Sequence, residues 1–249
     1  MPIPPISRRR VLRSAAALAT SAAAAPFIRT RPLRDRLKLA AVGVANRGAA
    51  NLAGVLSQDV AVMCDVDSGM LARGLGQVEA AGQKRPKTYV DWRELLDQEK
   101  DLAGIVISTP DHLHAPIARA ALRRKIAVYC EKPLTRTVDE ALELQGLAKT
   151  AGVATQMGTQ IHSTENYRRV VEAIRAGAIG DVHTVHVVCR KSWSNGRFTE
   201  PKPAPEELNW DLWLGPTPER PYCDGVHPAD WRRFWAFGTG TVGDMACHW

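Results

Sequence analysis

The residues best suited to chemistry are Glu131-Lys132-Pro133, which follow the apolar run at residues 126–130. Such a run predicts a buried strand, and a lysine at the carboxyl end of a parallel strand points into the crevice where open α/β sheets bind ligands. An ammonium group there can exchange a proton with a substrate hydroxyl, or stay charged and orient substrate oxygens. The alternative is a strand-end lysine in solvent with Glu131 as its surface partner.

A second candidate centre is Asp244 with His248, four positions apart near the end of the chain. On a helix these residues share one face and can touch. A carboxylate beside an imidazole fixes its tautomer and raises its basicity, as a general base requires. An ordinary pair on a helix surface is the alternative. No zinc-ligand spacing surrounds the pair or the five cysteines, so no metal site and no disulfide framework are predicted.

A glycine-containing turn, Gly43-x-Ala45-x-x-Gly48, lies between an apolar strand and a helix that begins near Arg47. It departs from the dinucleotide fingerprint at Ala45, where a methyl group is tolerable if the loop shifts slightly. Phosphates would then contact free N–H groups at the start of the helix. The predicted contacts are Gly43, Ala45, Asn46, Arg47 and Gly48. A glycine turn in a non-binding α/β domain is the alternative.

Two strand ends extend this prediction. Asp65 follows a strand 22 positions after Gly43, where an acid accepts hydrogen bonds from a ribose 2′-hydroxyl and repels a 2′-phosphate, which favours NAD over NADP. The loop at residues 109–114 follows another strand, and it would pass over the nicotinamide ribose unless it is only a polar loop with a helix cap. The further predicted cofactor contacts are Thr109, Pro110, His114, Glu131 and Lys132.

The elements that would position these residues alternate regularly. Apolar strands are expected at 37–44, 60–64, 102–108, 126–130 and 153–157, and helices at 47–56, 68–81, 91–98, 115–124 and 138–151. This alternation predicts a doubly wound parallel sheet covered on both faces. Beyond residue 158 we expect a helix at 164–176 and a strand of a second sheet at 181–190. Residues 192–249 are rich in Trp, Pro and Gly and show little periodicity.

The first 30 residues predict export. Arginines near the start precede a short apolar stretch and small residues, a pattern similar to a twin-arginine signal peptide, with a basic disordered tail as the alternative. The formal net charge of +7 falls to +3 without Arg8, Arg9, Arg10 and Arg13. Neither this charge nor any basic helix favours a nucleic-acid partner. We expect a periplasmic or extracytoplasmic protein with no stable membrane span after signal removal.

These motifs resemble the Gfo/Idh/MocA family, named for glucose–fructose oxidoreductase and inositol dehydrogenase, over residues 37–249. Glu131-Lys132-Pro133 is its most characteristic motif, and Thr109-Pro110-Asp111-x-x-His114 also matches. So does Gly238-x-Gly240-x-x-x-Asp244-x-x-x-His248, while residues 208–216 and 231–235 look like its exported bacterial branch. Ala45 and Ala246 depart from usual glycines. The chain stops at Trp249, where family members continue, so we expect a C-terminal truncation.

The resemblance implies a Rossmann domain at 37–157 and an incomplete α/β domain with an open mixed sheet at 158–249. It places Lys132, Asp244 and His248 at catalytic positions. Substrate contacts are expected from Lys132, Gln160 and His248, and the resemblance leaves room for a homo-oligomer in the complete protein.

The expected function is NAD-dependent hydride transfer between a secondary alcohol of a sugar- or polyol-like small molecule and the nicotinamide. Two alternatives remain. One is an NAD-dependent glycosidase that acts by oxidation and elimination with recycled NAD, which the tryptophans at 193, 210, 213 and 231 would suit by stacking on sugar rings. The other is a non-catalytic NAD-binding relative.

Overall fold

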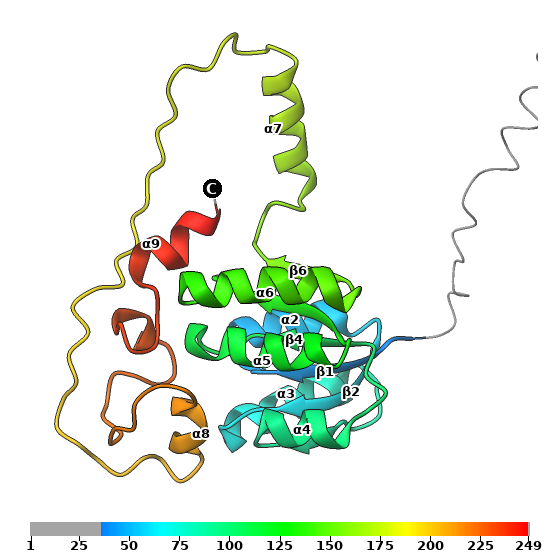
Figure 1. The fold of residues 1–249 in the computed structure, drawn as a ribbon, viewed down its shortest axis with the longest axis vertical. Helices are drawn as coiled ribbons and strands as arrows, with labels where there is room; N and C mark the ends of the chain where they lie inside the picture. Colours follow the sequence, from blue (N-terminus) through cyan, green and yellow to red (C-terminus); the bar gives the residue numbers. More distant parts are fainter. Residues whose placement is uncertain (1–35, 249) are drawn as a thin grey trace, which may run out of the picture. The chain divides into compact units, whose positions relative to one another are not determined.

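The computed structural model describes residues 36–248, so the signal peptide predicted at residues 1–30 lies outside the described residues. Strands and helices alternate up to residue 158 (Figure 1). The strands are β1 (Lys38–Val42), β2 (Asp59–Cys64), β3 (Lys87–Tyr89), β4 (Gly104–Ile107), β5 (Ala127–Glu131) and β6 (Thr155–Gly158). The helices among them are α2 (Arg47–Val55), α3 (Ser68–Ala80), α4 (Trp92–Gln98), α5 (Asp111–Arg123) and α6 (Val138–Ala151).

The six strands form one parallel sheet in the order β3-β2-β1-β4-β5-β6. The chain runs outward from β1 in one direction and then returns to add β4 on the other side. This reversal creates a switch point at the carboxyl ends of β1 and β4, where ligands bind in such sheets. The predicted doubly wound Rossmann fold is therefore confirmed.

Apolar side chains from the sheet pack in two layers. On one face, α4, α5 and α6 contribute Leu95, Ile117 and Leu144 to a buried cluster. On the other, α2 and α3 contribute Leu52 and Val78 to a second cluster. Because both faces are covered, the central strands β1, β2, β4 and β5 carry apolar runs without polar alternation. This explains why the runs could be recognised as strands.

Capping determines where several helices begin. The side chain of Thr137 accepts from the backbone N–H of Glu140, whose carboxylate accepts from Thr137 in return, so α6 begins as predicted. The side chain of Asp67 caps α3 by accepting from Met70 N–H. One expected boundary was wrong. Helix α5 begins at Asp111, four residues before the predicted start, directly after Pro110 at its N-cap, and it continues through Pro116.

The predicted strand at 181–190 is wrong. Residues 181–190 have no regular secondary structure and are exposed throughout, on the long connection after α7 (Glu165–Arg175) in Figure 1. A strand is stable only when a neighbouring strand pairs with its backbone N–H and C=O groups. Within residues 159–248 the structure contains no strand, so the alternating pattern has no pairing partner there. A second sheet is not formed by the described residues.

The C-terminal segment, residues 203–248, contains α8 (Trp210–Leu214), the 3₁₀ helix η2 (Asp230–Arg233), α9 (Gly240–Met245) and the 3₁₀ helix η3 (Ala246–His248). Its own apolar cluster includes Trp213, Trp231 and Phe237. It contacts the sheet domain where β2 ends: Ser68 N–H donates to Glu207 O at 2.9 Å, and Asn209 N–H donates to Val66 O at 2.8 Å.

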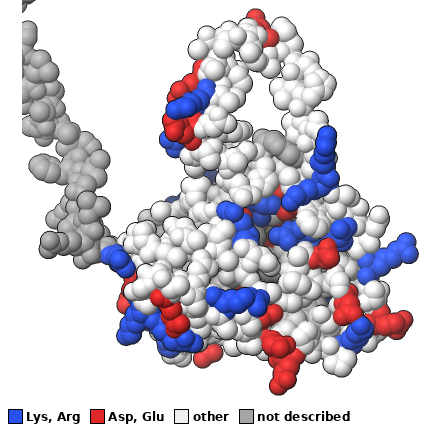
Figure 2. Space-filling model, turned by 180° about the vertical axis from the view of Figure 1, so that it is seen from behind, with Lys and Arg blue, Asp and Glu red and all other residues white. Residues whose placement is uncertain are grey.

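The surface carries charges of both signs, and Lys and Arg lie among Asp and Glu in Figure 2. Several are paired. Lys38 contacts Glu99 at 3.3 Å and Asp101 at 2.5 Å, and Arg124 contacts Asp97 at 2.6 Å. Exposed pairs of this kind contribute about 0–1 kcal/mol each, so the fold depends mainly on its apolar clusters.

His112 joins α5 to the C-terminal segment. Its ring is buried 5.0 Å from the ring of Trp213 and 5.3 Å from that of Phe237, and Nε2 donates to the carbonyl of Trp213 at 2.8 Å. Burial lowers the pKa of His112 from 6.5 to about 4. The folded protein therefore keeps this imidazole neutral in a pH range where the unfolded chain protonates it.

His112 should make the protein acid-sensitive. Stability contributed by a neutral buried histidine is complete above pH 6.5 and is lost as the pH falls toward 4. We expect the free energy of unfolding to fall by about 2 kcal/mol from this group between about pH 7.5 and pH 5, measured by denaturant titration. His112→Phe should reduce this fall, whereas His186→Phe, at an exposed histidine, should not. An equal pH dependence in all three proteins would contradict the assignment.

Candidate active site

The glycine turn brings the start of α2 against the end of β4. Gly43 has a φ of +76°, and a Cβ there would lie 2.8 Å from the backbone of Ser108. A Cβ at Gly48 would lie 2.1 Å from the carbonyl oxygen of Gly43. Asn46, at a φ of 50°, occupies the N-cap of α2 but makes no side-chain cap hydrogen bond. The first helical amides are thus without a capping side chain, as an anion-binding helix terminus requires.

A polar network holds this helix start against β5. The Glu131 carboxylate is buried, and its Oε1 accepts from Arg47 Nε at 3.1 Å and Asn51 Nδ2 at 2.9 Å. Asn51 also donates to Ser108 Oγ at 2.8 Å. Charge-assisted bonds to a buried carboxylate are strong and directional. Glu131 and Arg47, both predicted cofactor contacts, therefore fix the glycine turn, with Arg47 also lining the pocket beside it.

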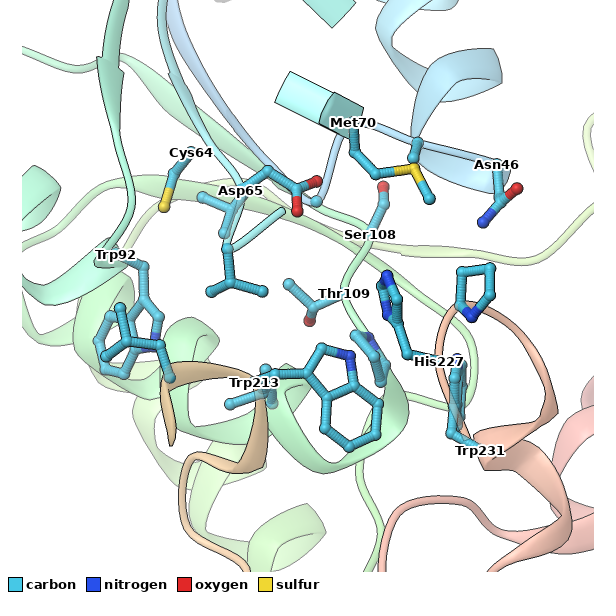
Figure 3. Close-up of a pocket in the computed structure, with 18 of the residues that line it drawn as sticks. Asn46, Cys64, Asp65, Met70, Trp92, Ser108, Thr109, Trp213, His227 and Trp231 are labelled. Atoms are coloured by element: carbon cyan, nitrogen blue, oxygen red, sulfur yellow. The ribbon is translucent and has the colours of Figure 1, made fainter. Parts of the chain in front are cut away.

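Asp65 lies at the carboxyl end of β2, on the wall of the same pocket (Figure 3). Its Oδ2 accepts from Val44 N–H at 2.9 Å, and its Oδ1 accepts from Asp67 N–H at 3.1 Å. Burial raises the pKa of Asp65, although these two backbone hydrogen bonds oppose that rise. A carboxylate has about four acceptor positions, so two remain for a ligand hydroxyl.

The pocket lies over the carboxyl ends of β1, β2 and β4 and is covered by the C-terminal segment (Figure 3). Thr109 Oγ1 is buried and makes no hydrogen bond to any described residue. A buried hydroxyl without a partner is a position that a bound ligand can satisfy. The lining of this pocket includes the predicted residues Gly43, Ala45, Asn46, Arg47, Asp65, Thr109 and Pro110.

Lys132 and Asp244 form the centre of the proposed catalytic group, although they are 112 positions apart. Lys132 Nζ lies 2.5 Å from Asp244 Oδ1 and donates to its backbone oxygen at 2.7 Å. Trp193 Nε1 donates to Asp244 Oδ2 at 2.6 Å, and Arg232 Nε lies 3.5 Å from Oδ1. Burial alone would raise the pKa of Asp244, but Lys132, together with the Trp193 hydrogen bond and the Arg232 charge, outweighs burial and lowers the pKa.

The expected contact between Asp244 and His248 is absent from the described residues. Helix α9 ends at Met245 and continues as the 3₁₀ helix η3, so the i,i+4 geometry of an α-helix is lost before His248. The Asp244 carboxylate instead faces Lys132 and Trp193. Burial and the Lys132 charge lower the pKa of His248, so its basicity is reduced and not raised as the spacing predicts.

His114 differs from its predicted role. Its ring is buried, with Nδ1 2.7 Å from the Pro133 carbonyl oxygen and Nε2 2.8 Å from that of Thr109. Both nitrogens thus face protein oxygens, and no polar atom of the ring is left for a direct cofactor contact. His114 connects the loop after β4 to the loop after β5, and it holds Thr109 and Lys132 in place.

Gln160 lies exposed in the bend after β6, whereas the hydrogen bonds of the Lys132 ammonium group go to Asp244. Two residues later, His162 Nε2 lies 3.1 Å from the carbonyl oxygen of His248. The two predicted substrate-binding segments are therefore adjacent at this point.

Sequence reasoning missed two residues that the structure places at the site. Arg232 lines the pocket and also lies beside Asp244, so it connects the two candidate centres. His227 lines the pocket and contacts Asp67, with Nε2 3.0 Å from Oδ2. These residues come from the aperiodic end of the chain, where only the Trp231–Trp235 resemblance gave a signal, and it assigned no role.

Other kinds of site find no support in residues 36–248. No group of three or more His, Cys, Asp or Glu side chains there could hold a metal ion. The cysteines are free, and burial raises the pKa of the Cys64 and Cys130 thiols. None of the helices in this range has the length and apolar character needed to cross a bilayer.

Similar proteins were found among curated sequences. A protein called "Glycosyl hydrolase family 109 protein" from Stenotrophomonas maltophilia is 27% identical, over 71% of this chain and 40% of its own length. The levoglucosan dehydrogenase of Pseudarthrobacter phenanthrenivorans is 27% identical, over 64% of this chain and 33% of its own length. The chain thus spans less than half the length of these relatives.

Solved structures share the fold. The myo-inositol 2-dehydrogenase of Lactobacillus plantarum superposes with a TM-score of 0.54 at 22% identity, over 59% of this chain and 43% of that one. The scyllo-inositol dehydrogenase of Lactobacillus casei, solved with NAD(H) and scyllo-inositol, gives 0.53 at 20% identity, over 59% and 43%.

Family sequence profiles match most of the chain. The profile described as an oxidoreductase family with an NAD-binding Rossmann fold matches residues 30–159. The profile for the C-terminal α/β domain of such oxidoreductases matches residues 173–249. Together with the parallel sheet and the turn at its switch point, these matches show that the chain belongs to the Gfo/Idh/MocA family of NAD-binding oxidoreductases.

Proposed function

We propose that this protein transfers hydride between a secondary alcohol of a sugar- or polyol-like substrate and NAD. The observation that carries the proposal is the Lys132–Asp244 pair, which lies where β5 ends, with Arg232 connecting it to the pocket. Relatives that are named as sugar and inositol dehydrogenases support the substrate class.

The pocket fits a dinucleotide. The uncapped start of α2 would bind the pyrophosphate, Asp65 would accept from a ribose hydroxyl, and Thr109 Oγ1 would gain the partner that it lacks. We infer NAD in preference to NADP because Asp65 and Asp67 would both repel a 2′-phosphate. Arg47 does not offset this repulsion, since its guanidinium is already bonded to Glu131.

Bound NAD supplies a hydride acceptor, and the protein's residues must manage the proton and the developing charge. Lys132 would donate a hydrogen bond to the substrate oxygen and stabilise its negative charge. Asp244 holds the ammonium group in position from two of its oxygens. His248 would accept the hydroxyl proton, although burial and the Lys132 charge lower its pKa and so weaken it as a base.

A second candidate is glycoside hydrolysis with recycled NAD, which the relative called "Glycosyl hydrolase family 109 protein" favours. Both reactions need the same proton acceptor and oxygen-stabilising group, so the geometry of Lys132 and Asp244 serves either. A non-catalytic NAD-binding protein remains a third reading. In all three cases we propose export by the twin-arginine route to the periplasm or beyond.

One pair of assays separates these functions. Purified protein is incubated with NAD and free inositols or sugars, and separately with aryl glycosides without added NAD. We expect NADH absorbance to rise in the first assay, with little rise when NADP replaces NAD. Release of the aryl group in the second assay alone would assign hydrolysis. NAD binding without turnover in either assay would contradict catalysis.

A further inference from the structure

His227 reaches the cofactor pocket from outside the Rossmann sheet. It precedes η2 in the C-terminal segment and lines the pocket together with Pro228 and Trp231 (Figure 3). Its side chain is only 15% exposed. A histidine on a long connection is usually solvated, so burial against the pocket wall indicates a specific place in the structure.

His227 lies at the same strand end as Asp65. Its Nε2 is 3.0 Å from Asp67 Oδ2, while Asp67 N–H donates to Asp65 Oδ1 at 3.1 Å. Asp67 Oδ1 in turn accepts from Met70 N–H at 2.8 Å and begins α3. Helix α3 therefore fixes the Asp67 carboxylate, and this carboxylate fixes the imidazole of His227.

These partners assign the tautomer of His227. An ionised carboxylate only accepts hydrogen bonds, so Nε2 must carry the proton that it donates to Asp67. In the neutral imidazole, Nδ1 then has a free lone pair. Nδ1 is buried and makes no hydrogen bond to any residue from 36 to 248. Leaving a buried acceptor unpaired costs about 1–3 kcal/mol, and a hydroxyl from a ligand would remove that cost.

We propose that His227 is a further cofactor-binding residue whose Nδ1 accepts a hydrogen bond from a hydroxyl of the adenosine ribose. This inference rests on the proposed NAD-binding function. The adenosine ribose is the relevant group because an acid at the end of the second strand, here Asp65, binds that sugar in dinucleotide-binding sheets. The C-terminal segment would thereby bind the same sugar from the side opposite Asp65 and cover it.

The test compares two probes, ADP and 2′,3′-dideoxy-ADP, which differ only in the ribose hydroxyls. Their dissociation constants are measured by calorimetry for the wild-type protein and for His227→Gln. The Gln amide can still donate to Asp67, but it has no acceptor in the position of Nδ1. We expect the wild-type preference for ADP to fall about five- to tenfold in His227→Gln, as loss of one hydrogen bond predicts.

Two further variants separate contact from folding. His227→Asn places an amide oxygen near the Nδ1 position, so it should keep more of the preference for ADP than His227→Gln. His186→Gln, at an exposed histidine outside the pocket, should behave as wild type. Melting temperatures are measured for each variant.

The outcomes are distinct. An unchanged ratio of ADP to dideoxy-ADP affinity in His227→Gln overturns the role of His227 and leaves NAD binding intact. Equal weakening of both probes also overturns it, because the effect would then come from the fold. If wild-type protein binds neither ADP nor NAD, the proposed function itself fails.

Discussion

Replacing Lys132 with methionine should lower turnover by about 10²- to 10⁴-fold, the usual range for loss of a proton-transfer or charge-stabilising group. Methionine retains the length and most of the volume of the side chain but cannot donate to a substrate oxygen. Asp244 would still be held by Trp193 at 2.6 Å and by Arg232 at 3.5 Å, so folding should survive. The measurement is kcat/KM beside the dissociation constant for NAD, which should change little.

The matched control for this variant is Lys149→Met, on the exposed side of α6, which should keep wild-type activity. Near-normal turnover in Lys132→Met would remove the ammonium group from the chemistry. Loss of NAD binding in parallel with activity would mean that Lys132 supports the pocket and not the reaction.

Replacing Gly48 with alanine should disrupt the glycine turn that we propose binds the pyrophosphate. The new Cβ would lie 2.1 Å from the carbonyl oxygen of Gly43, and backbone atoms would have to move to accept it. Overpacking of this kind costs about 1–3 kcal/mol, occasionally more. Because the displaced atoms belong to the turn itself, NAD affinity should fall at least tenfold. Thermal unfolding and calorimetric titration measure the two effects.

Gly54 supplies the control within the same helix. A Cβ there meets no atom within 4 Å, so Gly54→Ala should leave NAD binding unchanged. It should also stabilise the protein by up to about 1 kcal/mol, because alanine is the better helix former. Equal melting temperatures for the two alanine variants would show that the close approach at Gly48 does not matter.

The sheet was predictable because a strand that is buried on both faces has a continuous apolar sequence. The four central strands β1, β2, β4 and β5 are apolar runs, whereas the edge strand β3 is short and polar and was not expected. The residues that follow the central strands, such as Asp65 and Lys132, fall at the carboxyl edge whatever the details of packing. Helix α6 was predictable to the residue because Thr137 and Glu140 cap it locally.

The partners of Asp244 were not predictable from spacing. The sequence suggested His248, four positions after Asp244, as its partner. In the structure the partner is Lys132, 112 positions away, because α9 ends early and the carboxylate turns toward the sheet. The role of His227 was equally hidden, since its contact with Asp67 joins residues 160 positions apart. Long-range contacts of this kind depend on how the aperiodic C-terminal segment packs.

The strand expected at 181–190 failed for a related reason. Alternation shows which face a strand would present, but it cannot supply the neighbour whose backbone completes the hydrogen bonds. The local pattern therefore described helix α7 well and residues 181–190 poorly.

The most direct test of the central claim is a crystal structure of the protein with NAD. We predict that the pyrophosphate lies at the start of α2 and that the nicotinamide ring faces the ammonium group of Lys132. A nicotinamide ring turned away from Lys132, or a pocket that takes up no dinucleotide at saturating NAD, would contradict the account.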